Sequence, residues 1–280
     1  MILSFASGTA AALPAWPMAL TLASMLALSS YAIAAGWTLR GGTGFRTALL
    51  VGWLAQAAAI AIDISGAGAA QAGARFGFAP ALSATCWLVL AVYLIESRFL
   101  PIVGARRGLA LLGAGVVLLA WLFPGVIRPH VAPRWAPLHW VLGIASYGLF
   151  GAAVLHAALL SRAERALRMK SVGGAAPDGS MPLLQIERLT FRFVAAGFVL
   201  LTATLLLGAA HPEPWRWDHK AVFSILGWLV FAGLLVGRRT FGWRGPLATR
   251  WLYAGAVMLL LAYVGSRFVL EVILHRSVAG

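Results

Sequence analysis

Residues 189–210, LTFRFVAAGFVLLTATLLLGAA, form one long apolar run with a single charged side chain, Arg192. A helix needs about 20 predominantly apolar residues to cross the hydrocarbon core of a bilayer. Because that core holds no water, the backbone groups of a spanning segment must bond within the segment, which favours a helix. The run therefore predicts a transmembrane helix.

Seven further runs have the same length and apolar character. Hydrophobic residues make up 61% of the 280-residue chain and charged residues only 11%, against about 25% charged residues in soluble proteins. The alternating pattern of a membrane β-barrel is absent. We therefore expect one domain over residues 1–280, an all-α polytopic integral membrane protein with about eight transmembrane helices. The other seven helices are predicted at residues 17–39, 46–64, 79–97, 107–127, 137–161, 219–237 and 248–273.

The basic residues are distributed unequally between the two sides of this predicted bundle. Lysine and arginine gather in the cytoplasmic loops of membrane proteins, so we predict that the richer side is inside and that both termini lie outside. Basic cytoplasmic loops account for the net charge of +14, so we do not expect nucleic-acid binding. The inner side carries 15 of the 22 basic residues: Arg40, Arg46, Arg98, Arg106, Arg107, Arg162, Arg165, Arg168, Lys170, Arg188, Arg192, Arg238, Arg239, Arg244 and Arg250. The outer side carries Arg75, Arg128, Arg134, Arg216, Lys220, Arg267 and Arg276.

The histidines gather on the opposite side from the basic residues. Only His156 falls toward the inner end of its predicted helix, and neutral histidine has little influence on topology. A site near the outer surface accounts better for this distribution. The five outer histidines are His130, His139, His211, His219 and His275.

His139 lies in the stretch LHWVLGIASYGLF, in the first turn of its predicted helix. His139, Gly143 and Tyr147 are spaced four residues apart and share one helix face. The glycine one turn below the imidazole leaves room for a flat ligand, and Tyr147 adds an aromatic wall and a hydroxyl. An interfacial histidine that bonds to a neighbouring loop is the alternative interpretation.

His219 repeats the pattern at the start of the next-to-last predicted helix. His219, Phe223 and Gly227 place an imidazole, an aromatic ring and a glycine on one face. Imidazole is a common metal ligand, and two histidines from separate helices can bind one haem iron from opposite sides. A helix cap or an interfacial residue is an equally good interpretation.

The last predicted helix contains a third candidate, His275. Glu271 lies one turn earlier and can orient its ring. Charges within membrane helices are costly, which makes Arg267 and Glu271 functional candidates. Arg267 can pair with Glu271, extend its charged end to the interface, or meet an anionic group such as a haem propionate.

Tryptophans crowd the same outer face. Trp135, Trp140, Trp215 and Trp217 fit an ordinary interfacial belt, or an aromatic platform for a planar ligand. No nucleophile elbow, P-loop, H-E-x-x-H motif or dinucleotide fingerprint occurs in the sequence. We therefore do not expect a catalyst of common enzyme chemistry.

Several of these stretches resemble those of a known family. They are LHWVLGIASYGLF, PLLQIERLTFRFVAAGFVLLTATLLLG, WRWDHKAVFSILGW, GWRG and AYVGSRFVLEVILHR. The chain resembles the cytochrome c assembly family, haem-handling membrane proteins of CcsA/CcmC type, and within it the eight-helix branch called YpjD-like or HemX-like. The resemblance is good over residues 135–276, whereas the first four helices, within residues 1–134, match by hydropathy alone.

The resemblance assigns roles to particular residues. The first outer histidine of the family and its Ser-Tyr pair match His139, Ser146 and Tyr147, and a second outer histidine matches His275. A His-Lys pair typical of the short branch matches His219 and Lys220. The Trp-x-Trp-Asp-x-Lys core of the tryptophan-rich haem-binding segment matches Trp215, Trp217, Asp218 and Lys220.

This tryptophan-rich motif departs from the family pattern on both sides of its core. Ala221, Val222 and Phe223 stand where the family continues with Glu-Thr-Trp, and residues 211–214 replace its upstream glycine and aromatic residues. The departure weighs against direct presentation of haem to an apocytochrome more than against haem binding.

The resemblance implies a haem-binding protein of cytochrome c biogenesis that handles or delivers haem at the outer face of a bacterial inner membrane. We hypothesise that His139 and His219 ligate the iron of a non-covalent b-type haem, with His275 as a competing ligand. Its expected partners are the lipid bilayer, haem and, through the family, other assembly proteins or apocytochrome. The tryptophans would shield the macrocycle, and the propionates would meet Arg267, Lys220 or Arg216.

Two other functions fit parts of the sequence. A b-type cytochrome in quinone-linked electron transfer would carry histidine pairs at both membrane depths, and the inner side offers only His156. A haem-free accessory subunit of a membrane complex would tolerate replacement of the histidines.

Overall fold

The computed structural model describes residues 17–37, 43–67, 73–98, 103–128, 136–170, 183–210 and 217–269. Within these ranges all eight predicted helices are present, and the chain is an all-α polytopic membrane protein. A π-helix (Leu261–Gly265) and the one-turn helix α9 (Ser266–Phe268) continue the last of them. The long helices are α1 (Met18–Trp37), α2 (Thr43–Ser65), α3 (Phe78–Glu96), α4 (Arg106–Leu122), α5 (Ala136–Lys170), α6 (Leu183–Ala209), α7 (His219–Phe241) and α8 (Gly245–Leu260).

Helices α4, α5 and α6 depart furthest from their predicted bounds, and for identifiable reasons. Helix α4 has only 17 residues, because Pro124 disfavours helical backbone in the residue before it and Gly125 adopts a positive φ of 73°. The other seven long helices of the described ranges are long and apolar enough to cross a membrane. Helices α5 and α6 extend beyond their apolar runs, to Lys170 and from Leu183, because their flanking Ala, Leu, Glu and Arg residues are strong helix formers.

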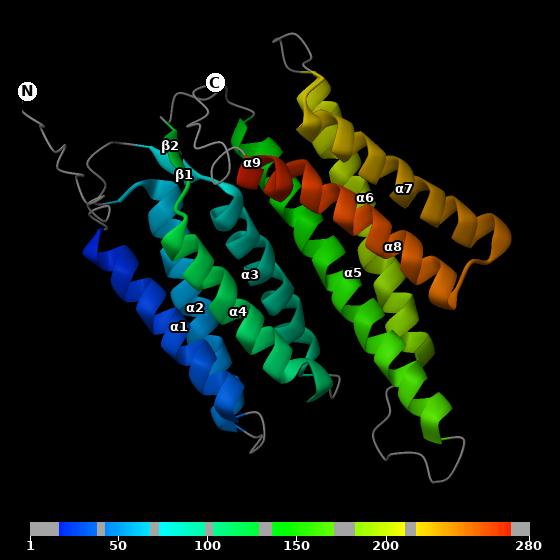
Figure 1. Cartoon of the computed structure of the whole chain (residues 1–280), viewed down its shortest axis with the longest axis horizontal. Coiled ribbons are helices and arrows are strands. Elements are labelled where there is room, and N and C mark those ends of the chain that lie inside the picture. The colour runs from blue at the N-terminus through cyan, green and yellow to red at the C-terminus, as the bar shows by residue number, and fades with distance from the viewer. Residues whose placement is uncertain are drawn as a thin grey trace, which may run out of the picture.

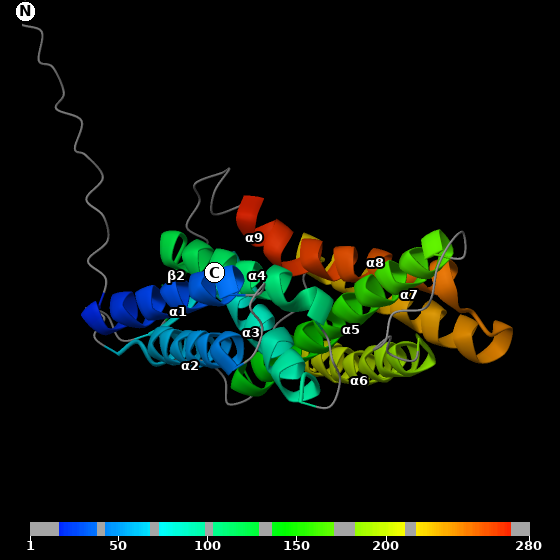
Figure 2. The same cartoon turned by 90° about the horizontal axis from the view of Figure 1, so that it is seen from below.

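The helices form two groups, α1–α4 and α5–α9 (Figure 1), and α3 and α5 cross where the groups meet in the turned view (Figure 2). Each group has its own apolar core. In the second core the rings of Phe150 and Phe231 stack with their centroids 3.9 Å apart. Gly255 permits this packing, since a Cβ there would lie 2.7 Å from the Phe231 ring. We call the groups the first half and the second half.

Hydrogen bonds fix the helices of the first half against one another. The Tyr31 hydroxyl donates to Gln56 Oε1 at 2.6 Å, and Gln56 Nε2 donates to the Ser83 hydroxyl at 3.0 Å. Trp53 and Trp87 stack at 4.8 Å, and each indole N–H donates to the other residue's backbone carbonyl. Because α2 and α3 are bonded in this way, the first half presents a fixed wall to the second.

The two halves meet along a seam, which we define as the packing of α3 against α5. A Cβ on Gly148 would lie 2.7 Å from Leu88 Cβ, and one on Gly151 would lie 2.7 Å from Val89 Cγ2. These glycines therefore allow the two helices to approach closely at the middle of the seam.

A short two-stranded sheet covers one end of the bundle. Strands β1 (Ala74–Phe76) and β2 (Val126–Arg128) pair antiparallel, with Arg75 opposite Ile127. They lie at the end where α3 and α5 begin (Figure 1). We call this the outer end, because the distribution of basic residues predicts that it faces outside, and the opposite end the inner end. Strands this short in a connecting loop leave no periodic pattern, and our sequence analysis did not predict them.

Candidate functional site

A cavity of about 600 Å³ lies between the two halves toward the outer end. Helices α1 to α4 and strand β1 line it from the first half, and α5, α6, α7 and the π-helix line it from the second. Its volume falls within the roughly 300–1,000 Å³ of pockets that hold cofactors and other small ligands. The cavity brings together residues that are up to about 240 positions apart, from Leu20 to Val264.

His139 lies in the cavity wall, in the first turn of α5, and its side chain is half-buried. Gly208 of α6 makes room for the imidazole, since a Cβ there would lie 3.3 Å from His139 Cε1. Gly143, one turn along α5, also lines the cavity, and the nearest atom to a Cβ placed on it is Thr204 Cγ2 at 3.8 Å. The predicted face of His139, Gly143 and Tyr147 is therefore turned into one cavity.

Tyr147 forms part of the same wall, but its hydroxyl has a backbone partner. It donates to the Leu259 carbonyl at 2.7 Å, in the last turn of α8 before the π-helix. Tyr263 and Val264 of the π-helix line the cavity as well, and π-helical turns occur frequently at functional sites. Tyr147 thus joins α5 to α8 at the cavity, and its ring supplies the aromatic surface.

The start of α7 brings Asp218 and Lys220 to the cavity. Asp218 is the N-cap residue, and its Oδ1 accepts a hydrogen bond from the Ala221 N–H at 2.8 Å. Such a cap satisfies a backbone donor that has no partner within the helix. Lys220 Nζ lies 5.7 Å from the centre of the Tyr263 ring. The Asp and Lys of the tryptophan-rich motif therefore place a structural carboxylate and a cation at the cavity.

His219 and Trp217 lie at the same end but outside the cavity wall. Both side chains are exposed, that of Trp217 by 74%, and neither is among the lining residues. The α7 face that reaches the cavity is formed by Lys220, Ala221 and Ser224. Gly227, at the end of the face predicted for His219, packs on Leu259 of α8 instead.

The remaining predicted site residues either lie away from the cavity wall or fall outside the described residues. Arg267 is half-buried in α9 and is not a lining residue. Trp215, Arg216, His275 and Glu271 lie outside the described residues. Their assignments stay predictions.

Our sequence analysis missed the contribution of the outer sheet and its neighbours. Arg75 and Phe76 of β1 line the cavity, and the Phe76 ring lies 4.1 Å from that of Trp140. Arg75 Nη1 is 3.8 Å from Asp63 Oδ1, and both side chains are almost buried. Asp63 lies near the end of α2. Nothing in a Gly- and Ala-rich loop indicates that Arg75 folds back over the bundle.

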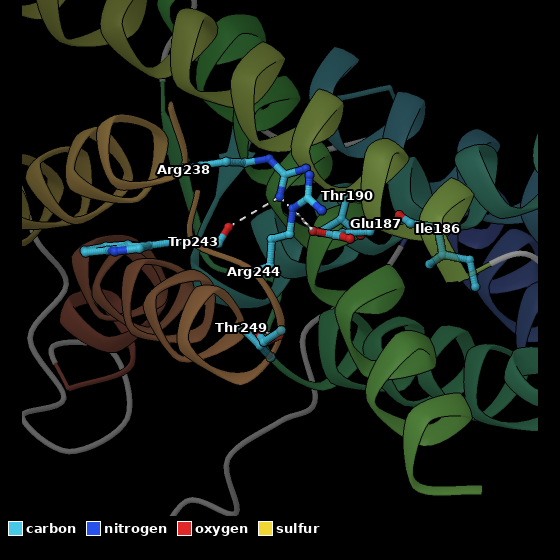
Figure 3. A network of polar contacts seen from close by, with 8 residues as sticks. Ile186, Glu187, Thr190, Arg238, Trp243, Arg244 and Thr249 are labelled. Carbon is cyan, nitrogen blue, oxygen red and sulfur yellow. Dashed lines mark hydrogen bonds and ion pairs between the residues drawn. The ribbon is translucent and has the colours of Figure 1, made fainter. Parts of the chain in front are cut away.

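The inner end is closed by ion pairs and carries no comparable cavity in the described part of the chain. Figure 3 shows Arg238 of α7, which donates to Glu187 of α6 at 2.8 Å, with Arg244 nearby. The Arg238 guanidinium also lies 3.5 Å from the centre of the Phe191 ring. Across the seam, His156 Nε2 lies 2.9 Å from Glu96 Oε2. The hydrogen bond between Arg238 and Glu187 joins α7 to α6, and the close approach of His156 to Glu96 lies where α5 packs on α3.

The sequence was compared with known proteins. It is 37% identical over 139 residues to the inner membrane protein YpjD of Escherichia coli K12, covering 49% of this chain and 52% of that protein. It is 35% identical over 86 residues to the cytochrome c biogenesis protein CcsA of Prochlorococcus marinus NATL1A, covering 29% and 27%. With CcsA of P. marinus SARG the identity is 26% over 167 residues, covering 50% and 53%. These matches span about half or less of the relatives' length, and no solved structure matches.

The family comparison covers more of the chain than the individual relatives do. Residues 22–274 match the family described as cytochrome C assembly protein. The match begins within α1 and therefore includes the first four helices, where our sequence analysis found similarity in hydropathy alone. The chain thus belongs to the cytochrome c assembly protein family.

Proposed function

We propose that this protein binds haem in the outer cavity and handles it during cytochrome c biogenesis. The observation that carries the proposal is the cavity itself. It gathers an imidazole, aromatic walls and two cationic side chains from both halves, in a volume of about 600 Å³. Family membership and relatives named for cytochrome c biogenesis support the same function.

The residues present fit a haem group. His139 supplies a nitrogen ligand, and Phe76, Trp140 and Tyr147 supply apolar surface of the kind that planar ligands pack against. Gly143 lines the cavity without a side chain, which suits a flat group close to the α5 backbone. When bound, haem would supply an iron centre that the imidazole nitrogen of His139 could ligate.

His139 is the ligand that we assign first, because it lies in the cavity wall. His219 and His275 are the two candidates for the opposite ligand. His219 begins α7 two residues after Trp217 and one before Lys220, beside the cavity rather than in it. A ligand role for His219 therefore requires its first turn to move toward the cavity.

The haem propionates are carboxylates, and Arg75 and Lys220 line the cavity from opposite halves. A guanidinium binds a carboxylate through two parallel hydrogen bonds, whereas an ammonium acts as a point charge. We therefore propose that both contribute to propionate binding, in addition to Arg267 and Arg216 from our sequence analysis.

In this function the protein is an assembly factor in a bacterial inner membrane, and haem is its cargo. The cavity lies toward the end predicted to face outside, where haem would be handed to other assembly proteins or apocytochrome. The His156 geometry favours this role over that of an electron carrier with haems at two depths. His156 is completely buried, its Nδ1 bonds to the Ala152 carbonyl at 2.7 Å, and its Nε2 lies 2.9 Å from Glu96 Oε2.

The proposal is tested by purifying the protein with a haem supply and recording its absorption spectrum. We expect a bound haem in the wild type and a loss of more than about 100-fold in affinity for His139→Ala, since outer-shell changes alone cost roughly 10–100-fold. His219→Ala and His275→Ala identify the second ligand by which of them alters the spectrum.

His130→Ala and His211→Ala are matched controls, because both are outer histidines without an assigned role. Their spectra should equal that of the wild type. A haem-free wild type, or a spectrum that His139→Ala leaves unchanged, would contradict the proposal and favour a haem-free accessory subunit.

A further inference from the structure

Three arginines at the inner ends of α6 and α7 differ from the paired cations beside them. The side chains of Arg188, Arg192 and Arg239 are exposed, and none of them forms a hydrogen bond or an ion pair within the described part of the chain. Arg238, by contrast, is bonded to Glu187 at 2.8 Å (Figure 3). The three exposed guanidinium groups therefore remain available to an anion from outside the protein.

Helix periodicity places two of these arginines on the face of α6 that no other helix covers. Arg188, Arg192 and Val199, which is 65% exposed, follow one another along that face. The covered faces of α6 are different ones, since Phe198 stacks on Trp228 of α7 and Gly197 packs on Phe150 of α5. In a membrane, the uncovered face of α6 is the one that meets lipid.

Arg239 lies on the same side of the two helices. Helices α6 and α7 run antiparallel, since two side-chain hydrogen bonds join them in reversed order along the chain. Glu187 and Arg238 face each other across the pair, and each following residue is turned by about 100°. Because the helices run in opposite directions, this turn carries Arg188 and Arg239 toward the same lipid-facing surface.

Arg192 lies at the edge of the hydrocarbon region. Helix α6 has 27 residues and is about 40 Å long, whereas the core of a bilayer is about 30 Å thick. Counted back from Ala209 at the outer end, about 20 residues fill that core and reach Thr190. A charge that faces lipid at this depth is costly unless it reaches the headgroups. Helical side chains lean toward the helix N-terminus, so Arg192 leans toward Arg188 and the inner surface.

The charges at this corner are not balanced within the described helices. Glu187 is the sole acidic residue of α6, α7 and α8, and it is already bonded to Arg238. Arg188 and Arg192 are four residues apart on one helix, where like charges repel each other. An anion bound between them removes this repulsion, and the planar guanidinium matches a phosphate group through two parallel hydrogen bonds.

We propose that the inner ends of α6 and α7 bind one anionic phospholipid. Its phosphate and headgroup contact Arg188, Arg192 and Arg239, and its acyl chains lie along the apolar surface that includes Val199 and Val236, which are 65% and 57% exposed. Basic residues between membrane helices are a known form of headgroup site. Charge complementarity at headgroup depth, next to an apolar surface, selects a lipid as the occupant. This site is separate from the outer cavity and does not depend on haem binding.

The test is native mass spectrometry of the full-length, delipidated protein in detergent. The protein is titrated with dioleoylphosphatidylglycerol, which is anionic, and with dioleoylphosphatidylcholine, which has the same acyl chains and no net charge. We expect the anionic lipid to bind at least about tenfold more tightly, because each basic residue contributes about fivefold to the binding of anionic lipid. Glycerophosphoglycerol, the headgroup without acyl chains, should compete weakly.

Substitutions of the three arginines locate the site. Arg192→Gln alone should weaken phosphatidylglycerol binding about fivefold, and the triple variant Arg188→Gln/Arg192→Gln/Arg239→Gln about 100-fold. Binding of phosphatidylcholine should stay unchanged, which shows that the variant is folded. A triple lysine variant at the same positions keeps the charge and should retain the preference for the anionic lipid.

A second triple variant is the matched control. Arg98→Gln/Arg107→Gln/Arg250→Gln removes the same number of exposed arginines from α4, α8 and the end of α3 at the inner end, and its lipid preference should equal that of the wild type. The proposal is overturned by a wild type without a preference for the anionic lipid, or by a preference that survives in the first triple variant. Equal losses in both triple variants, or competition by the free headgroup as strong as by the lipid, would overturn it too.

Discussion

The outer and inner ends of the seam are built from similar residue types and have opposite character. At the inner end, Glu96 lies 2.9 Å from His156 and Glu187 binds Arg238, so each of these four groups faces a partner on another helix. At the outer end, His139, Lys220 and Arg75 come from different elements and line one cavity.

This difference separates groups that hold the fold together from groups arranged around a space. Buried charges are costly unless they are paired, and Glu187 with Arg238 at the inner end, like Arg75 with Asp63 at the outer end, satisfies that requirement within the protein. The outer groups surround a volume large enough for a cofactor, in which an anionic planar ligand can interact with several of them. The comparison predicts that substitutions filling the cavity change ligand binding. Substitutions at the inner pairs, at the seam, or at groups that already have a partner within the protein should change stability instead.

Filling the outer cavity should have the largest effect. Gly143→Phe adds a ring to the cavity wall between His139 and Tyr147, beside Thr204, and we expect haem retention to be abolished. The measurement is the haem-to-protein ratio after purification. Gly115→Phe is the control, since Gly115 is an exposed helical glycine with no atom within 4 Å of its Cβ position. Equal haem content in both variants would show that haem binds elsewhere.

Crowding the middle of the seam should lower stability next most strongly. In Gly148→Ala the new Cβ would lie 2.7 Å from Leu88 Cβ and Cδ1, and overpacking of this kind costs about 1–3 kcal/mol. Thermal unfolding in detergent measures the loss. Gly115→Ala should raise stability slightly, by up to about 1 kcal/mol, because alanine is the better helix former. A Gly148→Ala variant as stable as the wild type would indicate that α3 and α5 are not closely packed.

Removing the cap of α7 should have a smaller effect. Asp218→Ala leaves the Ala221 N–H without its side-chain partner and should cost about 1 kcal/mol. Asp218→Asn keeps an acceptor oxygen and should preserve stability. Amide exchange in the first turn of α7 reports the change directly. If Asp218→Asn instead loses haem while remaining stable, the carboxylate has a role in ligand binding as well.

The Tyr147 hydroxyl should have the smallest effect. Tyr147→Phe removes the hydrogen bond to the Leu259 carbonyl and should cost about 0.5–1.5 kcal/mol of unfolding free energy. The absorption spectrum of bound haem should stay the same, since the ring that forms the cavity wall is retained. A shifted spectrum would show that the hydroxyl contacts the ligand.

The transmembrane helices could be predicted because bilayer thickness requires a minimum apolar length, and residues 189–210 meet that requirement without any knowledge of neighbours. The inner ends of α5 and α6 could not be predicted from hydropathy. Hydropathy drops where charged residues begin, whereas the helix propensity of those residues stays high, so the helices continue beyond the apolar runs. The strands could not be predicted either, since Arg75 and Ile127 pair across two intervening helices.

The candidate site was predicted where local spacing was sufficient. His139, Gly143 and Tyr147 share a face by periodicity, and that face lines the cavity. The same four-residue spacing in α7, from His219 to Gly227, did not identify the face that lines the cavity. Gly227 packs on Leu259, and the adjacent face, which carries Lys220, reaches the cavity. Which face of a helix meets a cavity depends on its neighbours, and these are not encoded in the segment itself.

The central claim is that His139 ligates haem in the outer cavity, and imidazole rescue of His139→Gly tests it most directly. Removal of the side chain leaves a space beside Gly208 and Gly143 in which free imidazole can replace it. The account predicts that haem is lost from His139→Gly and that added imidazole restores both haem binding and the wild-type spectrum. Haem that stays bound to His139→Gly with an unchanged spectrum, in the absence of imidazole, would contradict the claim.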